Sequence, residues 1–241
     1  TADLQQLNSS LILAQHQLKE RNQELDAFVY MVSHDLKAPL RSISNLSEWI
    51  EEDLRDRFEE DECQQFEVLR QRVKRMDALI DGLLRYSRVG SQKLESETVD
   101  VSQLVAEMID SLAPPAGFRI EILSPLPTLD TKRILLAQIF ANLLTNAIKH
   151  HDQPDGLIEI GVKDLGDRYQ FSIADDGPGV PLAADRHRIF EMFQTLKPSI
   201  STENTGIGLA LVKKIIEGEG GRIWLDIDRS QGACFYFTWS K

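Results

Sequence analysis

The stretch FVYMVSHDLKAPLRSI, residues 28–43, decides the fold of the first part of the chain. Apolar residues recur in it at helical spacing, and only Pro39 breaks the helical pattern. A proline inside a helix lacks the backbone N–H and clashes with the preceding turn, so it kinks the helix but need not end it. We therefore predict one long helix that continues beyond Pro39 through Ile50.

The residues before this stretch extend the same helix. Apolar side chains recur there every seven residues, which is the spacing of a parallel coiled coil. The members of this heptad row are Leu4, Leu11, Leu18, Leu25 and Val32. Because the chain begins inside the pattern with no capping residue before it, we expect a fragment of a longer protein.

A second apolar row predicts a second helix. Its members alternate steps of three and four residues, as one face of a helix does. They are Phe66, Leu69, Val73, Met76, Ile80 and Leu83. The acidic segment between the helices, residues 51–62, is interpreted as a solvated turn, with partner contact as the alternative. Since a two-helix hairpin cannot bury both apolar faces by itself, we predict that two chains pair as a homodimeric four-helix bundle.

Residues 88–97 lose this periodicity and are predicted to be a linker between two domains, residues 1–88 and 98–241. The second domain alternates helices and strands, which is typical of a layered α/β sandwich. Helices are predicted at 102–112, 131–150 and 206–217, and strands at 118–123, 157–162, 169–174, 222–227 and 234–239.

The composition excludes several classes of function. With 27 Lys and Arg against 38 Asp and Glu, the net charge is -11, which disfavours nucleic acid and anionic membranes as partners. No apolar run approaches the ~20 residues that a membrane span requires. Cys63 and Cys234 form no CxxC pair, which fits a soluble protein of a reducing cytoplasm.

His34 and Asp35 form the first candidate site. His34 lies two residues after Val32, about 200° around the helix, and is therefore predicted to face solvent. Asp35 can accept a hydrogen bond from one ring nitrogen and leave the lone pair of the other nitrogen free to attack phosphorus. For a pair on its own, a solvated polar helix face is the more ordinary interpretation.

A polar stripe on the helix at 131–150 forms the second candidate site. Gln138, Asn142, Asn146 and Lys149 share one face of an otherwise apolar helix. Amide oxygens with one lysine suit a partly hydrated Mg²⁺ that bridges phosphates. A polar face capped by solvent is the alternative.

Two glycine-rich segments form the third and fourth candidate sites. Residues 175–179, DDGPG, follow a strand, and their glycines let the backbone approach a planar ring. Residues 205–211, TGIGLAL, open a helix whose N–H groups and dipole favour a phosphate. Each segment alone is also compatible with an ordinary turn.

Taken together, these segments resemble the sensor histidine kinases of two-component signalling, in the family's order and spacing over residues 25–240. Among these kinases, the chain looks most like those attached to phytochrome-type sensors. The resemblance implies a dimeric helical bundle followed by an ATP-binding α/β sandwich of the Bergerat type, shared with gyrase and the Hsp90 chaperones. It also implies ATP and Mg²⁺ as cofactors, an upstream sensor domain outside this chain, and a response-regulator receiver domain as partner.

The resemblance assigns roles to individual residues. His34 is the phosphorylated residue, Asp35 its acid/base helper, Asn146 the Mg²⁺ ligand, and Asp175 the acceptor for the adenine amino group. The residues implied to bind nucleotide are Asn142, Asn146, Lys149, Asp175, Gly177, Gly179, Lys197, Thr205, Gly206, Gly208 and Leu209. Phe190 and Phe193 resemble a lid motif that is expected to pack when nucleotide closes the lid.

The chain departs from the family pattern at three positions. Ala38 replaces the Thr or Asn that positions water for dephosphorylation, which favours kinase over phosphatase activity. Asn204 stands where a glycine is usual. Thr195 replaces an arginine, and we expect Lys197 to take over its phosphate contact.

The predicted function is autophosphorylation of His34 from Mg-ATP, followed by transfer of the phosphoryl group to an aspartate of the receiver domain. One alternative is a non-catalytic, nucleotide-binding dimeric scaffold. Another is a gyrase-like or chaperone-like ATPase, which leaves the His34 helix unexplained.

Overall fold

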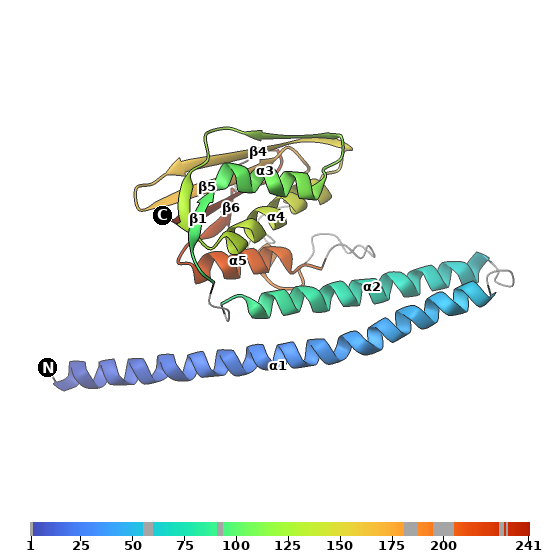
Figure 1. Ribbon diagram of the computed structural model, residues 1–241, viewed down its shortest axis with the longest axis horizontal. Helices are drawn as coiled ribbons and strands as arrows, with labels where there is room; N and C mark the ends of the chain where they lie inside the picture. Colours follow the sequence, from blue (N-terminus) through green and yellow to red (C-terminus); the bar gives the residue numbers. More distant parts are fainter. Residues whose placement is uncertain are drawn as a thin grey trace. The chain divides into compact units, whose positions relative to one another are not determined.

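The computed structural model describes residues 2–54, 60–90, 94–180, 188–194, 205–226, 229 and 231–241. The chain divides into two compact units with the break between residues 91 and 92. The first unit is a helical hairpin, and the second is an α/β sandwich (Figure 1). This order confirms the predicted fold class.

The hairpin consists of α1, Ala2–Leu54, and α2, Glu60–Arg88. Helix α1 continues through Pro39, as predicted. Leu40 of α1 is buried with three apolar residues of α2. The α2 members of this cluster are Val73, Ile80 and Leu84.

The heptad row is not the face of α1 that packs on α2. Ser33, Leu40 and Ser47, spaced seven residues apart, are all at most 5% exposed. By contrast, Leu25 of the heptad row is 59% exposed and Val32 is only half-buried. A single hairpin therefore uses one face of α1 internally and leaves a second apolar face exposed.

The second unit contains short helices and two sheets. Its elements are β1 Glu97–Asp100, α3 Val101–Leu112, β2 Gly117–Ile122, β3 Thr128–Thr131, α4 Arg133–Lys149, β4 Asp155–Asp164, β5 Arg168–Asp175, the 3-10 turn η1 Arg188–Phe190, α5 Gly208–Gly218, β6 Ile223–Leu225 and β7 Cys234–Ser240. The main sheet has the order β2-β4-β5-β7-β6, and only β2 and β4 are parallel neighbours. Helices α3, α4 and α5 lie together on one face of this sheet (Figure 1).

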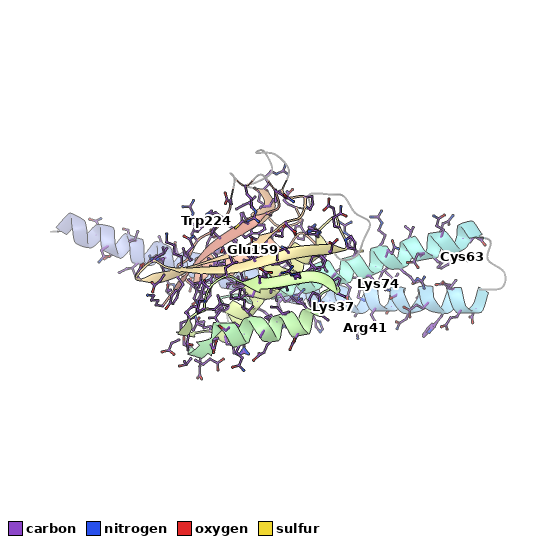
Figure 2. The ribbon with its side chains drawn as sticks, turned by 90° about the horizontal axis from the view of Figure 1, so that it is seen from above. Lys37, Arg41, Cys63, Lys74, Glu159 and Trp224 are labelled. Atoms are coloured by element: carbon purple, nitrogen blue, oxygen red, sulfur yellow. The ribbon has the colours of Figure 1, made fainter. Side chains whose placement is uncertain are left out.

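The core of the sandwich lies between α4 and the central strands. Phe140 of α4 meets Phe171 of β5 and Phe237 of β7, with ring centroids 5.7 Å and 5.9 Å away. All three side chains are fully buried. Trp224 of β6 and Glu159 of β4, labelled in Figure 2, lie on the sheet. Both are only half-buried, and the Trp224 ring stacks on Tyr236 with centroids 5.6 Å apart. Burial of the α4 face against β5 and β7 fixes where the polar stripe of α4 lies.

The sequence did not predict strands β1 and β3, which pair antiparallel at the start of the second unit. Each strand has four residues and only one buried apolar side chain, Val99 or Leu129, so neither shows an apolar alternation in the sequence. Trp239 of β7 donates a hydrogen bond from Nε1 to Oγ1 of Thr131, 2.9 Å away. Three predicted elements were also too wide. Helix α4 covers Arg133–Lys149, because Thr131 belongs to β3. Helix α5 begins at Gly208, and β6 covers only Ile223–Leu225.

Candidate functional site

His34 lies near the middle of the described α1 helix, and its side chain is 74% exposed. The preceding residue, Ser33, is 1% exposed. Because consecutive helical residues point about 100° apart, burial of Ser33 turns His34 outward. The Nδ1 atom of His34 lies 3.3 Å from Oδ1 of Asp35. This geometry leaves Nε2 as the ring nitrogen directed away from the carboxylate.

Polar contacts fix α2 against α1 on both sides of His34. On one side, Ser87 donates a hydrogen bond from Oγ to the Asp26 carbonyl at 3.0 Å. On the other side, Lys37 forms an ion pair with Asp81. Lys37 lies with Arg41 and Lys74 along the hairpin (Figure 2). The helix that presents His34 is therefore held against α2 on either side of it.

Helix α4 presents its predicted polar stripe next to the start of α5. The side chain of Asn142 donates a hydrogen bond from Nδ2 to the carbonyl of Gln138 at 2.7 Å. A Cβ atom on Gly208 would lie 2.9 Å from Asn142 Oδ1, so a larger residue would require the Asn142 amide to shift. Asn146 is half-buried, whereas Lys149 is exposed. The structure thus brings the amide stripe and the second glycine segment together.

Asp175 is the last residue of β5, and its carboxylate is held by the backbone. Its Oδ1 atom accepts hydrogen bonds from the N–H of Gly177 at 3.1 Å and of Ala233 at 3.2 Å. Burial raises the pKa of Asp175, and the two backbone bonds only partly oppose that rise. Both bonds use Oδ1, so the carboxylate has a fixed orientation.

Glycines make the backbone around Asp175 close-packed. Gly179 and Gly232 have φ of 73° and 72°. A Cβ on Gly179 would lie 2.6 Å from the Gly232 carbonyl oxygen, and one on Gly232 only 1.8 Å from that of Asp175. Gly232 was missed by sequence reasoning, because it stands in a short turn before β7 with no motif around it.

The segment between the glycine segments is described only in part. Phe190 packs edge-on against Phe235 of β7, with ring centroids 6.2 Å apart. Phe193 is 54% exposed and has a φ of 64°. Gly206 contacts this segment, since its carbonyl accepts a bond from Phe193 N–H at 2.9 Å. Thr205 and Leu209 are half-buried beside it. Lys197, Thr195 and Asn204 lie outside the described residues.

Sequence reasoning also missed His151. Its side chain is 4% exposed, and Nε2 lies 3.0 Å from Oδ1 of Asp176. It borders a cavity of about 450 Å³ that is also lined by Arg119, Asp176 and Gly177. A His just after a helix carries no sequence signal of burial, and its partner Asp176 is brought beside it only by the end of β5.

His151 predicts a pH dependence of stability. Burial lowers the pKa of His151, but the bonds to Asp176 and to the Gln153 carbonyl, with the charges of Asp176 and Asp152, raise it more, so its pKa lies above 6.5. Since protonation is favoured in the folded state, this stabilisation is complete below 6.5 and is lost as pH rises through the raised pKa. The native chain should have a higher melting temperature than His151→Gln, and this difference should be larger at about pH 6 than at about pH 9. An equal gap at both values would contradict this assignment.

Comparison with known proteins identifies both units. Residues 24–92 match the family described as His Kinase A (phospho-acceptor) domain. Residues 131–241 match the family described as histidine kinase-, DNA gyrase B-, and HSP90-like ATPase. The two families therefore fall on the hairpin and on the sandwich.

The relatives are sensor kinases and phytochromes. Cyanobacterial phytochrome B of Nostoc sp. (strain PCC 7120) is 38% identical over 229 residues, which cover 92% of this chain and 30% of that protein. The adaptive-response sensory kinase SasA of Synechocystis sp. (strain PCC 6803) is 30% identical over 99% of this chain and 66% of its own length. The chain thus spans about a third of the phytochrome relatives' length.

The fold also matches a solved structure. Full-length ShkA in complex with AMPPNP superposes with a TM-score of 0.65 and 27% identity, over 88% of this chain and 45% of that one. Within the part of the chain that the structure describes, no helix combines the length and apolar character that crossing a membrane requires.

With a phosphoacceptor-type hairpin, a histidine kinase-like ATPase sandwich and these relatives, the chain belongs to the sensor histidine kinases of two-component systems.

Proposed function

We propose that the chain phosphorylates His34 from Mg-ATP and then transfers the phosphoryl group to an aspartate of a response-regulator receiver domain. The observation that carries this proposal is the exposed His34 ring with Asp35 Oδ1 at 3.3 Å from Nδ1. Membership of a kinase family with both a phosphoacceptor hairpin and an ATPase sandwich supports it. ShkA, the solved relative, is described as bound to the ATP analogue AMPPNP.

The residues around Asp175 are proposed to bind adenine. With Oδ1 bonded to two backbone N–H groups, Oδ2 is the oxygen we assign to the adenine amino group. Gly177 and Gly179 keep the adjacent backbone free of side chains, so a flat ring can approach. Gly206, Gly208, Thr205 and Leu209 form the segment proposed to accept the phosphates at the start of α5.

Helix α4 is proposed to hold the metal and the phosphates. A half-buried Asn146, an amide oxygen of Asn142 and the cation of Lys149 form a donor set that fits Mg²⁺ and phosphate oxygens. We assign Asn146 as the Mg²⁺ ligand, with Asn142 and Lys149 at the phosphates, and Lys197 as a further phosphate contact. When bound, Mg²⁺ neutralises charge on the phosphate oxygens.

His34 is proposed to act as the nucleophile. Asp35 accepts the Nδ1–H bond and keeps the lone pair on Nε2. The Nε2–P bond forms as the bond from the γ-phosphorus to the ADP oxygen breaks, and ADP leaves with that electron pair. The Nε2–P bond then breaks as an aspartate oxygen of the receiver takes the phosphoryl group. The ring returns to its starting state.

The hairpin is proposed to work as a homodimer, with a phosphotransfer domain at 1–88 and a catalytic domain at 98–241. The exposed apolar face of α1 and α2 supports this, since a second hairpin would bury it. Its members include Leu25, Phe28, Leu46, Leu69 and Met76, all more than 40% exposed. Because ATP is its substrate and its cysteines are free thiols, we propose a cytoplasmic location.

Leu25→Glu should therefore shift the chain from dimer to monomer. A charge placed in a buried apolar interface lacks a partner and its solvation. Sedimentation velocity across a concentration series measures the change. Leu123→Glu is the matched control, since Leu123 is 60% exposed on the other unit. A native chain that sediments as a monomer, or a Leu25 variant that stays dimeric, would refute the assigned interface.

Incubation with γ-labelled ATP tests the proposed activity. A histidine kinase gives acid-labile label on the protein. A nucleotide-binding scaffold gives binding without label, and a gyrase-like ATPase gives steady phosphate release without label.

A further inference from the structure

The imidazole of His151 lies directly behind the first glycine segment. It follows α4 and packs edge-on against Phe118 of β2, with centroids 5.3 Å apart. A Cβ atom placed on Gly156 would lie 2.8 Å from its Nε2 atom. The ring therefore fills a close-fitting space between β2, β4 and the end of β5.

His151 is joined to the end of β5 through Asp176. The Asp176 carboxylate receives the His151 Nε2 contact at 3.0 Å and the Leu157 N–H at 2.8 Å, both on Oδ1. The Asp176 N–H in turn donates to the Leu157 carbonyl at 3.2 Å. These bonds lock the residue that directly follows Asp175 onto β4.

Gly177 lies between the His151 ring and the Asp175 carboxylate. A Cβ on Gly177 would be 3.0 Å from His151 Cδ2 and 3.1 Å from Asp175 Oδ1. The N–H of Gly177 also donates to Asp175 Oδ1 at 3.1 Å. Any movement of the Gly177 peptide toward the ring would therefore lengthen a bond that orients Asp175.

We propose that His151 is a positioning residue for nucleotide binding: it supports Gly177 and Asp176 from behind and thereby fixes the orientation of the Asp175 carboxylate. This inference rests on the proposed nucleotide site and deepens it. His151 does not contact the reacting atoms in this scheme, so its loss should weaken nucleotide affinity and leave the phosphorylation rate at saturating ATP unchanged.

His151→Ala is expected to weaken binding of Mg-ADP about tenfold, the scale of losing one charge-assisted hydrogen bond. Titration calorimetry on the whole chain measures this affinity at a temperature where thermal unfolding shows the variant folded. The autophosphorylation rate at saturating ATP should stay within about twofold of the native rate. His151→Gln keeps an N–H donor for Asp176 and should recover most of the lost affinity.

Trp239→Phe separates positioning from general stability. It removes the buried bond from Trp239 to Thr131, at the opposite end of α4 from Asn146, and should lower the melting temperature while preserving affinity. If Trp239→Phe loses as much affinity as His151→Ala, or if His151→Ala binds like the native chain, the positioning role is refuted while the nucleotide site stands. If the native chain itself binds no Mg-ADP, the proposed function fails as well.

Discussion

His34→Gln is expected to remove phosphoryl labelling of the chain, with a fall of at least about a thousandfold, the scale seen when an enzyme loses its nucleophile. Glutamine has no lone pair on nitrogen that can attack phosphorus, so no substitute reaction follows. The side chain at this position is 74% exposed. Its replacement should therefore change the free energy of unfolding by no more than about 0.5 kcal/mol.

His16→Gln is the matched control for this experiment. His16 lies on the same helix, is 69% exposed, and has Glu20 one turn away at 3.5 Å. It should label like the native chain, because its helix position lies outside the phosphoacceptor segment. If the His34 variant kept the acid-labile label and the His16 variant lost it, His16 would be the phosphorylated residue and the mechanism would be wrong.

Asp175→Asn is expected to weaken Mg-ADP binding by about 10- to 100-fold, the range for losing a hydrogen bond to a charged group. The amide oxygen can still accept from Gly177 and Ala233, which places the NH₂ group where Oδ2 was. That group is a donor and would face the donor amine of adenine. Autophosphorylation should fall in parallel at low ATP concentration and recover at high concentration.

Asp167→Asn is the control for charge alone. Asp167 lies in the exposed turn between β4 and β5 and pairs with its neighbour Arg168 at 2.8 Å. The Asp167 substitution removes the same unit of negative charge without changing Asp175 or the residues bonded to it. Equal loss of Mg-ADP affinity in both variants would show that the effect comes from net charge. Unchanged affinity in Asp175→Asn would show that this carboxylate does not bind the nucleotide.

Much of the fold could be predicted because its signals are local. The continuation of α1 through Pro39 follows from the apolar rows on either side of it, and helix α4 follows from one apolar face opposite a polar stripe. Strands β1 and β3 could not be predicted, because each has one buried apolar residue and is defined by pairing with the other.

The candidate site was predictable as residues but not as contacts. Asn142 and Gly208 were both predicted as site residues. Nothing in either segment shows that a Cβ on Gly208 would meet the side-chain amide of Asn142. Gly232 was not predicted, because the need for glycine there comes from the close approach of the Asp175 carbonyl, which is distant in the chain. Its φ is 72°.

The sequence by itself determined the helical hairpin, the α/β sandwich and the residue types able to bind nucleotide and accept a phosphoryl group. These depend on periodicity and side-chain chemistry, which are properties of single segments. Only the tertiary structure decided which row of α1 packs on α2, and that His151 lies against Gly177 and Asp176. Such contacts join segments far apart in the chain, and their free energy depends on shape and distance that no single segment encodes.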